Sequence, residues 1–98
     1  MTAYRHVIIR GRVQGVGYRI WTEVTALDRG IEGWVRNRHD GSVEAVFVGT
    51  EQAVADMIEA CRRGPAGARV ESIVQRDAGP ADIALRRSDE LFSVLGGA

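Results

Sequence analysis

Apolar and polar residues alternate in several segments of the chain, which is the pattern of strands that bury one face. Residues 6–13 place on one face Val7, Ile9, Gly11 and Val13, and on the other His6, Ile8, Arg10 and Arg12. Residues 31–37 and 43–48 alternate in the same way. Asp40-Gly41 lies between these two segments and predicts a hairpin, because glycine accepts the positive φ that such turns require.

Two other segments repeat their apolar residues with the period of a helix. Residues 19–29 are predicted to form a helix that buries a stripe of Ile20, Val24 and Leu27, with Trp21 alongside. Gly30 follows, where a glycine commonly ends a helix. A second helix is predicted after Thr50, a favourable N-cap, and its buried stripe is Val54, Met57, Ile58 and Cys61. Residues 64–67, Gly-Pro-Ala-Gly, end it.

The order of these elements predicts a ferredoxin-like fold. Residues 69–76 form a fourth strand, and a short extra strand follows near residues 91–95. The order β-α-β-β-α-β is typical of an α+β sandwich with two helices on one face of an antiparallel sheet. We expect residues 1–98 to form a single domain. In this topology the turn at residues 14–19 and the strand end at Asn37 lie at the same edge of the sheet.

Cysteine content and hydropathy exclude several classes of protein. The one cysteine of the 98 residues, Cys61, has no partner for an internal disulfide, so a reducing compartment such as the cytoplasm is expected. No apolar run approaches the roughly 18–20 residues of a membrane span, and the first residues lack the layout of a signal peptide. We therefore expect no membrane partner.

The charges balance overall but not locally. The chain has thirteen basic residues, all arginine, and thirteen acidic residues. The resulting net charge of zero argues against a nucleic-acid partner. Residues 1–19 hold four arginines and no acid, a charge of +4, whereas the rest holds nine arginines and thirteen acids, a charge of −4. The positive charge thus surrounds a glycine-rich turn.

That turn, residues 14–18, opens directly into the first predicted helix. Gly15 and Gly17 permit backbone conformations in which successive N–H groups converge on an anion, and the helix start adds partial positive charge. Arg19 adds a guanidinium that binds two phosphate oxygens at once. The turn matches neither a P-loop nor a dinucleotide-binding motif, and a merely tight connection is the alternative interpretation. Asn37 has two interpretations as well: a turn asparagine bonded to its own backbone, or a neutral group that orients a water.

Two motifs resemble the signatures of the acylphosphatase family. Residues 11–19, Gly-Arg-Val-Gln-Gly-Val-Gly-Tyr-Arg, resemble the first signature, and residues 33–37, Gly-Trp-Val-Arg-Asn, followed by residues 40–44, Asp-Gly-Ser-Val-Glu, resemble the second. Residues 64–70 and 92–94 are also similar to the family's pattern.

The resemblance implies a hydrolase that cleaves acyl phosphates without a metal, another cofactor or a phosphoenzyme. It assigns phosphoryl binding to Arg19 and water positioning to Asn37. The phosphate cradle is then the backbone of Gln14, Gly15, Val16, Gly17 and Tyr18. A monomer that acts on a small-molecule acyl phosphate is the simplest expectation.

Two other functions compete with this one. Sheets of this topology also bind RNA through aromatic residues on their open face, so a non-catalytic or RNA-binding module is one alternative. A part of a larger enzyme that handles acyl phosphates is the other. We expect a free-standing enzyme, since no zinc-finger cysteines follow the motifs.

Overall fold

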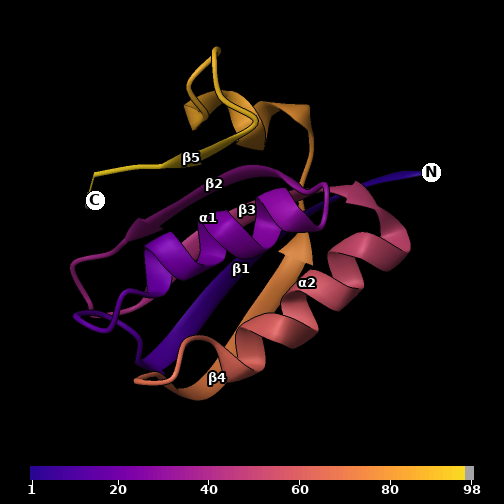
Figure 1. Ribbon diagram of the computed structural model, residues 1–98. Helices are drawn as coiled ribbons and strands as arrows, with labels where there is room; N and C mark the ends of the chain where they lie inside the picture. Colours follow the sequence, from indigo (N-terminus) through magenta and orange to yellow (C-terminus); the bar gives the residue numbers. More distant parts are fainter. Residues whose placement is uncertain (97–98) are drawn as a thin grey trace.

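The protein forms a five-stranded sheet with both helices on one face, in a computed structural model that describes residues 1–96 (Figure 1). The last two residues of the predicted domain lie outside this range. In chain order the elements are β1 (Thr2–Arg12), α1 (Tyr18–Asp28), β2 (Glu32–Asn37), β3 (Val43–Thr50), α2 (Glu51–Arg63), β4 (Arg69–Asp77), the 3-10 helix η1 (Pro80–Leu85) and β5 (Phe92–Val94). No helix within residues 1–96 is long and apolar enough to cross a membrane.

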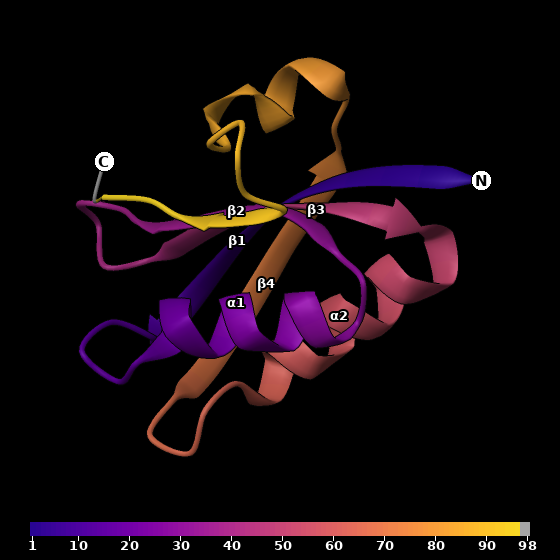
Figure 2. The ribbon, with the colours of Figure 1, turned by 45° about the horizontal axis from the view of Figure 1, so that its top comes forward.

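The sheet has the strand order β4-β1-β3-β2-β5. Its first four strands are antiparallel neighbours, and β5 adds itself parallel to β2. Figure 2 shows the two helices on one side of the sheet and η1 on the other. The predicted ferredoxin-like fold is confirmed, with β5 as the extra strand that makes the sheet mixed.

Local chemistry explains the β2–β3 hairpin. Arg38 N donates to Ser42 O at 2.9 Å, and Gly41 adopts a φ of 90°, as the turn requires. The Asp40 carboxylate accepts hydrogen bonds from the hydroxyl and the backbone N–H of Ser42. These bonds, together with one from Arg10, hold the pKa of Asp40 well below its usual range, so the carboxylate stays charged at neutral pH.

Helix α2 follows the sequence prediction closely. The Thr50 hydroxyl accepts a hydrogen bond from Ala53 N at 3.1 Å, so the predicted N-cap is confirmed. The stripe that was predicted to be buried is buried: Val54, Met57, Ile58 and Cys61. These side chains join the main core, which fills the space between the helices and the sheet.

The predicted stripe of α1 is wrong. Ile20, Val24 and Leu27 are 59%, 60% and 47% exposed. The face that packs on the core consists of Tyr18, Thr22 and Ala26. Thr22 and Ala26 are small enough to bring the helix close to the sheet, and the Thr22 hydroxyl is satisfied by Tyr18 O at 2.8 Å. A hydropathy pattern gives such small residues little weight, which is why it selected the opposite face.

Tyr18 fixes how α1 is turned about its own axis. Its hydroxyl donates to Cys61 O at 2.5 Å, in the last turn of α2, where backbone carbonyls lack helical partners. Burial raises the pKa of Tyr18, so its hydroxyl remains a donor. This bond therefore both satisfies a helix end and sets which residues of α1 face inward.

The segment after β4 covers part of the sheet face opposite the helices. Trp34, on β2, is 2% exposed there and donates from Nε1 to Asp82 O in η1 at 2.8 Å. Trp34 belongs to a second, smaller apolar cluster that includes Val46, Val48, Tyr4, Ile83 and Leu95. The sequence prediction left residues 77–90 without an element. The sequence did hold a signal, Pro80 at the first position of η1 and Asp82 at the third, and in the structure the Asp82 carboxylate accepts a hydrogen bond from Gly79 N.

Replacing Tyr18 by Phe should destabilise the protein. The change keeps the ring but leaves Cys61 O buried without its partner, which costs about 1–3 kcal/mol. Chemical denaturation measures this free energy of unfolding. Tyr4→Phe is the matched control, because no hydrogen bond of the Tyr4 hydroxyl occurs within residues 1–96. Equal stability of Tyr18→Phe and Tyr4→Phe would contradict the assigned role.

Candidate active site

The N-terminus of α1 has free backbone donors. Its N-cap residue is Gly17, no side chain caps the helix, and its first turn carries no acidic residue. Helix α2 differs, because Thr50 caps it and Glu51 lies in its first turn. The first N–H groups of a helix have no helical partner, and the helix dipole makes their surroundings partly positive. The start of α1 is thus suited to an anion.

Two left-handed glycines shape the turn that precedes α1. Gly15 has a φ of 75° and Gly17 a φ of 77°. A Cβ at either position would meet no heavy atom within 4 Å, so space does not require glycine there. The backbone conformation does, because residues with side chains rarely adopt these angles. The predicted conformational role of both glycines is confirmed.

A pocket of about 210 Å³ opens at this turn and contains both residues that the sequence singled out, Arg19 and Asn37. Its other lining residues are Val13, Gln14, Gly15, Gly17, Tyr18, Ile20 and Val94. Arg19 arrives from α1 and Asn37 from the end of β2. The shared sheet edge expected from the topology therefore exists. Val16 does not line the pocket: its side chain packs against the main core, and a role for its N–H stays a prediction.

Strand β5 and the residue after it close one side of the pocket, which the sequence prediction missed. Arg19 Nη1 donates to Leu95 O at 3.2 Å, just after β5, and Val94 lines the pocket. A guanidinium has five N–H donors, so this bond orients the group and uses one of them. Because β5 pairs in parallel with β2, Val35 and Val94 are partners in the sheet, which brings the residues just after β5 toward Asn37.

The Gln14 side chain connects the glycine turn to the hairpin after Asn37. Its Nε2 donates to Arg38 O at 2.8 Å and to Ser42 O at 2.9 Å. Both acceptors flank the hairpin, which begins one residue after Asn37. Gln14 therefore holds the two halves of the pocket together through its side chain, and its backbone remains the part assigned to the phosphate.

The positive charge around the turn is smaller than the sequence indicated. Arg5 lies near the other end of β1 and pairs with Asp77 at 2.6 Å. Arg10 pairs with Asp40 at 3.1 Å. Arg12 is exposed and does not line the pocket. Two of the four arginines are thus paired with acids from later in the chain, and Arg19 is the basic residue that lines the pocket.

No side chain in the pocket is suited to act as a general base. Its nine lining residues include no Asp, Glu, His, Cys or Lys. His6 lies on the open sheet face and contacts Glu44 at 2.6 Å, and His39 is exposed in the hairpin. Burial raises the pKa of the Cys61 thiol to about 12. Within residues 1–96, no group of three or more His, Cys, Asp or Glu residues is placed to hold a metal ion.

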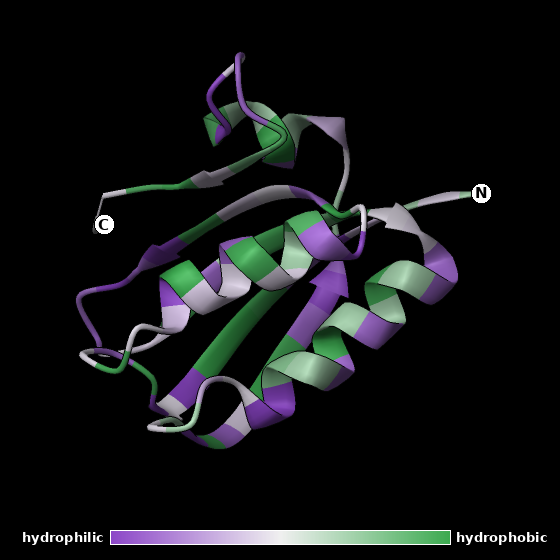
Figure 3. Cartoon of the chain, viewed as in Figure 1, coloured by the Kyte–Doolittle hydropathy of each residue, from purple (hydrophilic) through white to green (hydrophobic). Residues whose placement is uncertain are grey.

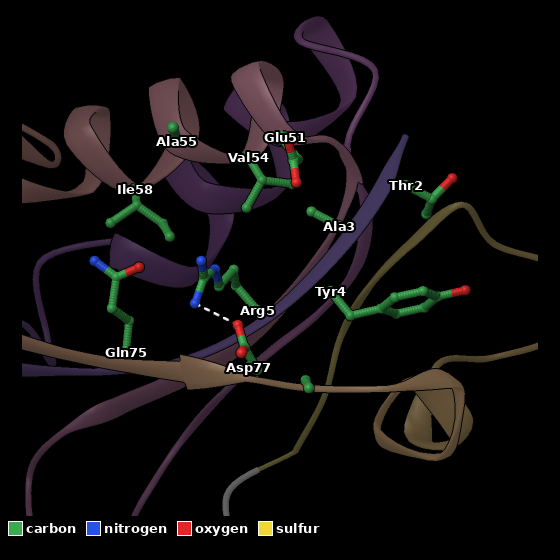
Figure 4. A pocket seen from close by; sticks show the side chains of 11 residues that line it. Thr2, Ala3, Tyr4, Arg5, Glu51, Val54, Ala55, Ile58, Gln75 and Asp77 are labelled. Atoms are coloured by element: carbon green, nitrogen blue, oxygen red, sulfur yellow. Dashed lines mark ion pairs between the residues drawn. The ribbon is translucent and has the colours of Figure 1, made fainter.

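A larger cavity, of about 340 Å³, lies near the start of β1 (Figure 4). Val54 and Ile58 of α2 reach toward Arg5 and Gln75 across it. The Arg5 guanidinium is paired with Asp77 there, so the cavity offers an anion little net charge. The smaller pocket, with its glycine turn and Arg19, is the better candidate for an anionic ligand.

Replacing Gln14 by Leu should weaken the junction between the turn and the hairpin. Two backbone carbonyls lose one donor each, although each keeps a backbone donor, Arg38 N for Ser42 O and Gly41 N for Arg38 O. The loss is therefore that of two ordinary hydrogen bonds, about 0.5–1.5 kcal/mol each. The free energy of unfolding should fall by about 1–2 kcal/mol. Gln52→Leu is the control, because Gln52 is exposed on α2 and its side chain donates a hydrogen bond to Asp56, one turn further along the same helix. A loss no larger than that of the control would refute the connecting role.

The chain matches known proteins along nearly its whole length. The acylphosphatase family model matches residues 5–85. The acylphosphatase of Bradyrhizobium diazoefficiens is 57% identical over 95% of this chain and 94% of its own length. The crystal structure of acylphosphatase from Bacillus subtilis covers 97% of this chain and 99% of its own, with a TM-score of 0.80 and 35% identity. Within the longer HypF of T. kodakarensis, 12% of that chain matches 97% of this one, with a TM-score of 0.76 and 29% identity. This chain therefore belongs to the acylphosphatase family.

Proposed function

We propose that this protein hydrolyses acyl phosphates to a carboxylate and inorganic phosphate, by direct attack of water on phosphorus. The new bond joins the water oxygen to phosphorus, and the bond between phosphorus and the acyl oxygen breaks. The electron pair of that bond leaves with the carboxylate, and the protons of the water pass to the phosphate and the solvent. The observation that carries this proposal is one pocket holding an uncapped helix start, Arg19 and Asn37.

The leaving group makes such a simple pocket sufficient. The leaving group is the carboxylate of an acid whose reference pKa is near 4. Such a weak base departs without a proton from a general acid. Catalysis of phosphoryl transfer rests mainly on positioning and on stabilising charge on the phosphoryl oxygens. The absence of Asp, Glu, His, Cys and Lys from the lining residues fits a reaction that needs no strong base.

In this proposal Arg19 and the backbone N–H groups of residues 14–18 hold the phosphoryl group. The left-handed conformation of Gly15 and Gly17 is of the kind that lets successive N–H groups converge on an anion, and the start of α1 adds the field of its dipole. The bond from Arg19 to Leu95 O keeps the guanidinium plane oriented. A planar fork then binds two phosphoryl oxygens, which a lysine cannot do.

Asn37 is assigned to the attacking water. Its side-chain carbonyl is a neutral acceptor, so it orients a water without repelling the anionic phosphoryl group. The hairpin that follows is held by Asp40, Ser42 and Gln14, which supports a fixed position for this amide.

The RNA-binding alternative finds less support. The aromatic residue on the open face of β2, Trp34, is 2% exposed and hydrogen-bonded to η1, so its ring is covered. Base stacking on such sheets requires exposed rings. The remaining expectations are proposals of the same kind: a single domain over residues 1–98, a monomer, a cytoplasmic location, and no metal, nucleic-acid or membrane partner.

Hydrolysis of benzoyl phosphate in the presence of a chelator tests the function directly. We expect activity that the chelator leaves unchanged and that inorganic phosphate inhibits competitively. Arg19→Ala should lower turnover at least about 10²–10³-fold, the loss typical of one donor to a developing anion. Arg19→Lys should also lose most of its turnover, because the point charge of an ammonium does not replace the bidentate guanidinium.

Arg12→Ala is the matched control for these variants, since Arg12 is exposed near the same turn and does not line the pocket. It should retain nearly all activity. An Arg19→Lys enzyme within a few fold of the parent would refute bidentate binding. Near-normal activity of Arg19→Ala would refute the assignment of Arg19.

Asn37→Ala should lower kcat more than it raises KM. The reason is that Asn37 is assigned to the water, which matters in the transition state, and not to binding of the ground state. Steady-state kinetics over a range of substrate concentrations separate the two parameters, and a thermal melt checks that the variant is folded. An effect on KM alone would reassign Asn37 to substrate binding.

A further inference from the structure

Three apolar side chains on the solvent side of α1 lack an explanation in the fold. Ile20, Val24 and Leu27, here named the outer stripe, are 59%, 60% and 47% exposed. Apolar residues recur along α1 in Figure 3. At about 100° per residue these three positions lie together, on the side of the helix opposite Tyr18, Thr22 and Ala26. Helices normally expose polar residues on that side.

The outer stripe begins at the proposed phosphate pocket. Ile20 lines that pocket, one residue after Arg19, and Val94 is an apolar lining residue from β5. The stripe then runs along α1 away from the pocket, and Ile20 and Leu27 are separated by about 10 Å along the helix axis. A substrate whose phosphoryl group lies at Arg19 thus finds a continuous apolar path for the rest of the molecule.

The charges beside the stripe select against a second anionic group. After Arg19, the charged residues of α1 are Glu23 and Asp28, both acidic. Glu23 is half-buried beside the stripe, and Asp28 is exposed at the end of α1. An acyl group with its own carboxylate or phosphate would lie near these carboxylates and be repelled by them, whereas a hydrocarbon chain carries no charge to be repelled.

We infer that the outer stripe of α1 is the binding surface for the acyl group, and that this enzyme prefers acyl phosphates of apolar carboxylic acids with extended chains. The inference rests on the proposed function and adds the substrate class. Contact with the stripe removes apolar surface from water both in the bound substrate and in the transition state. Longer apolar chains should therefore lower KM more than they raise kcat.

The test compares kcat/KM for acetyl, butyryl, hexanoyl and octanoyl phosphate. Full burial of one methylene corresponds to about a fourfold gain, and a surface that covers one side of the chain should give about twofold per methylene. Octanoyl phosphate should then exceed acetyl phosphate by some tens of fold. Succinyl phosphate, which has the four carbons of butyryl phosphate and a terminal carboxylate, should be hydrolysed more slowly than butyryl phosphate.

Val24→Ser and Leu27→Ser should each lower the octanoyl-to-acetyl ratio of kcat/KM about three- to fivefold, given the apolar area each side chain contributes. Leu27→Ser should affect octanoyl more than butyryl phosphate, because Leu27 lies farthest from the pocket. The matched control is Val74→Ser on β4, since Val74 is also 60% exposed but lies on the opposite edge strand of the sheet. All three positions are exposed, so these variants should remain folded, which a thermal melt checks.

Each outcome decides one question. Hydrolysis of acetyl phosphate without a gain for longer chains overturns the inference and leaves the proposed function intact. Failure to hydrolyse any of the four substrates overturns the proposed function itself. An equal fall of the ratio in Val74→Ser and Val24→Ser also overturns the inference. Sedimentation tests whether the stripe joins two subunits. If the parent protein is a dimer and Val24→Ser is a monomer, the stripe is a subunit interface, and the inference is overturned.

Discussion

The hydrogen bond from Tyr18 to the Cys61 carbonyl fixes the rest of the site, because it sets the rotation of α1. With Tyr18 turned inward toward α2, the next residue points about 100° further around the helix. This direction brings the Arg19 guanidinium to Leu95 O at the end of β5. One residue later, Ile20 faces the solvent at the mouth of the pocket. The burial of Tyr18, together with that of Thr22 and Ala26, thus sets where the cation and the apolar stripe of α1 lie.

The same helix is left without a cap at the end where an anion is expected. Thr50 satisfies the start of α2, whereas Gly17 leaves the first N–H groups of α1 free. A helix start with glycine at the N-cap is less stable than one with a capping side chain by roughly a few tenths of a kcal/mol. Bound phosphate would supply the missing acceptors, so this local cost is consistent with a binding function.

Ion pairs concentrate the positive potential of the pocket on one side chain. Arg5 and Arg10 are neutralised by Asp77 and Asp40, whose positions in the sequence are remote. Arg19 is held instead by a neutral carbonyl, which orients the guanidinium without cancelling its charge. A small dianion therefore meets one oriented cation rather than a diffuse basic surface, in keeping with the zero net charge of the chain.

Local patterns determined much of this protein from the sequence alone. Alternation, the Asp40-Gly41 turn, the Thr50 cap and the two left-handed glycines are short-range features, so the order of elements, the fold and the shared edge of Arg19 and Asn37 were predictable. The inward face of α1 was not predictable from the sequence. Thr22 and Ala26 are only weakly hydrophobic, and their burial depends on how closely the helix approaches the sheet. The partners of Arg5 and Arg10, the two bonds of Gln14 to the hairpin and the closure of the pocket by β5 were also beyond the sequence. All of them join residues far apart in the chain, and only tertiary packing brings such residues together.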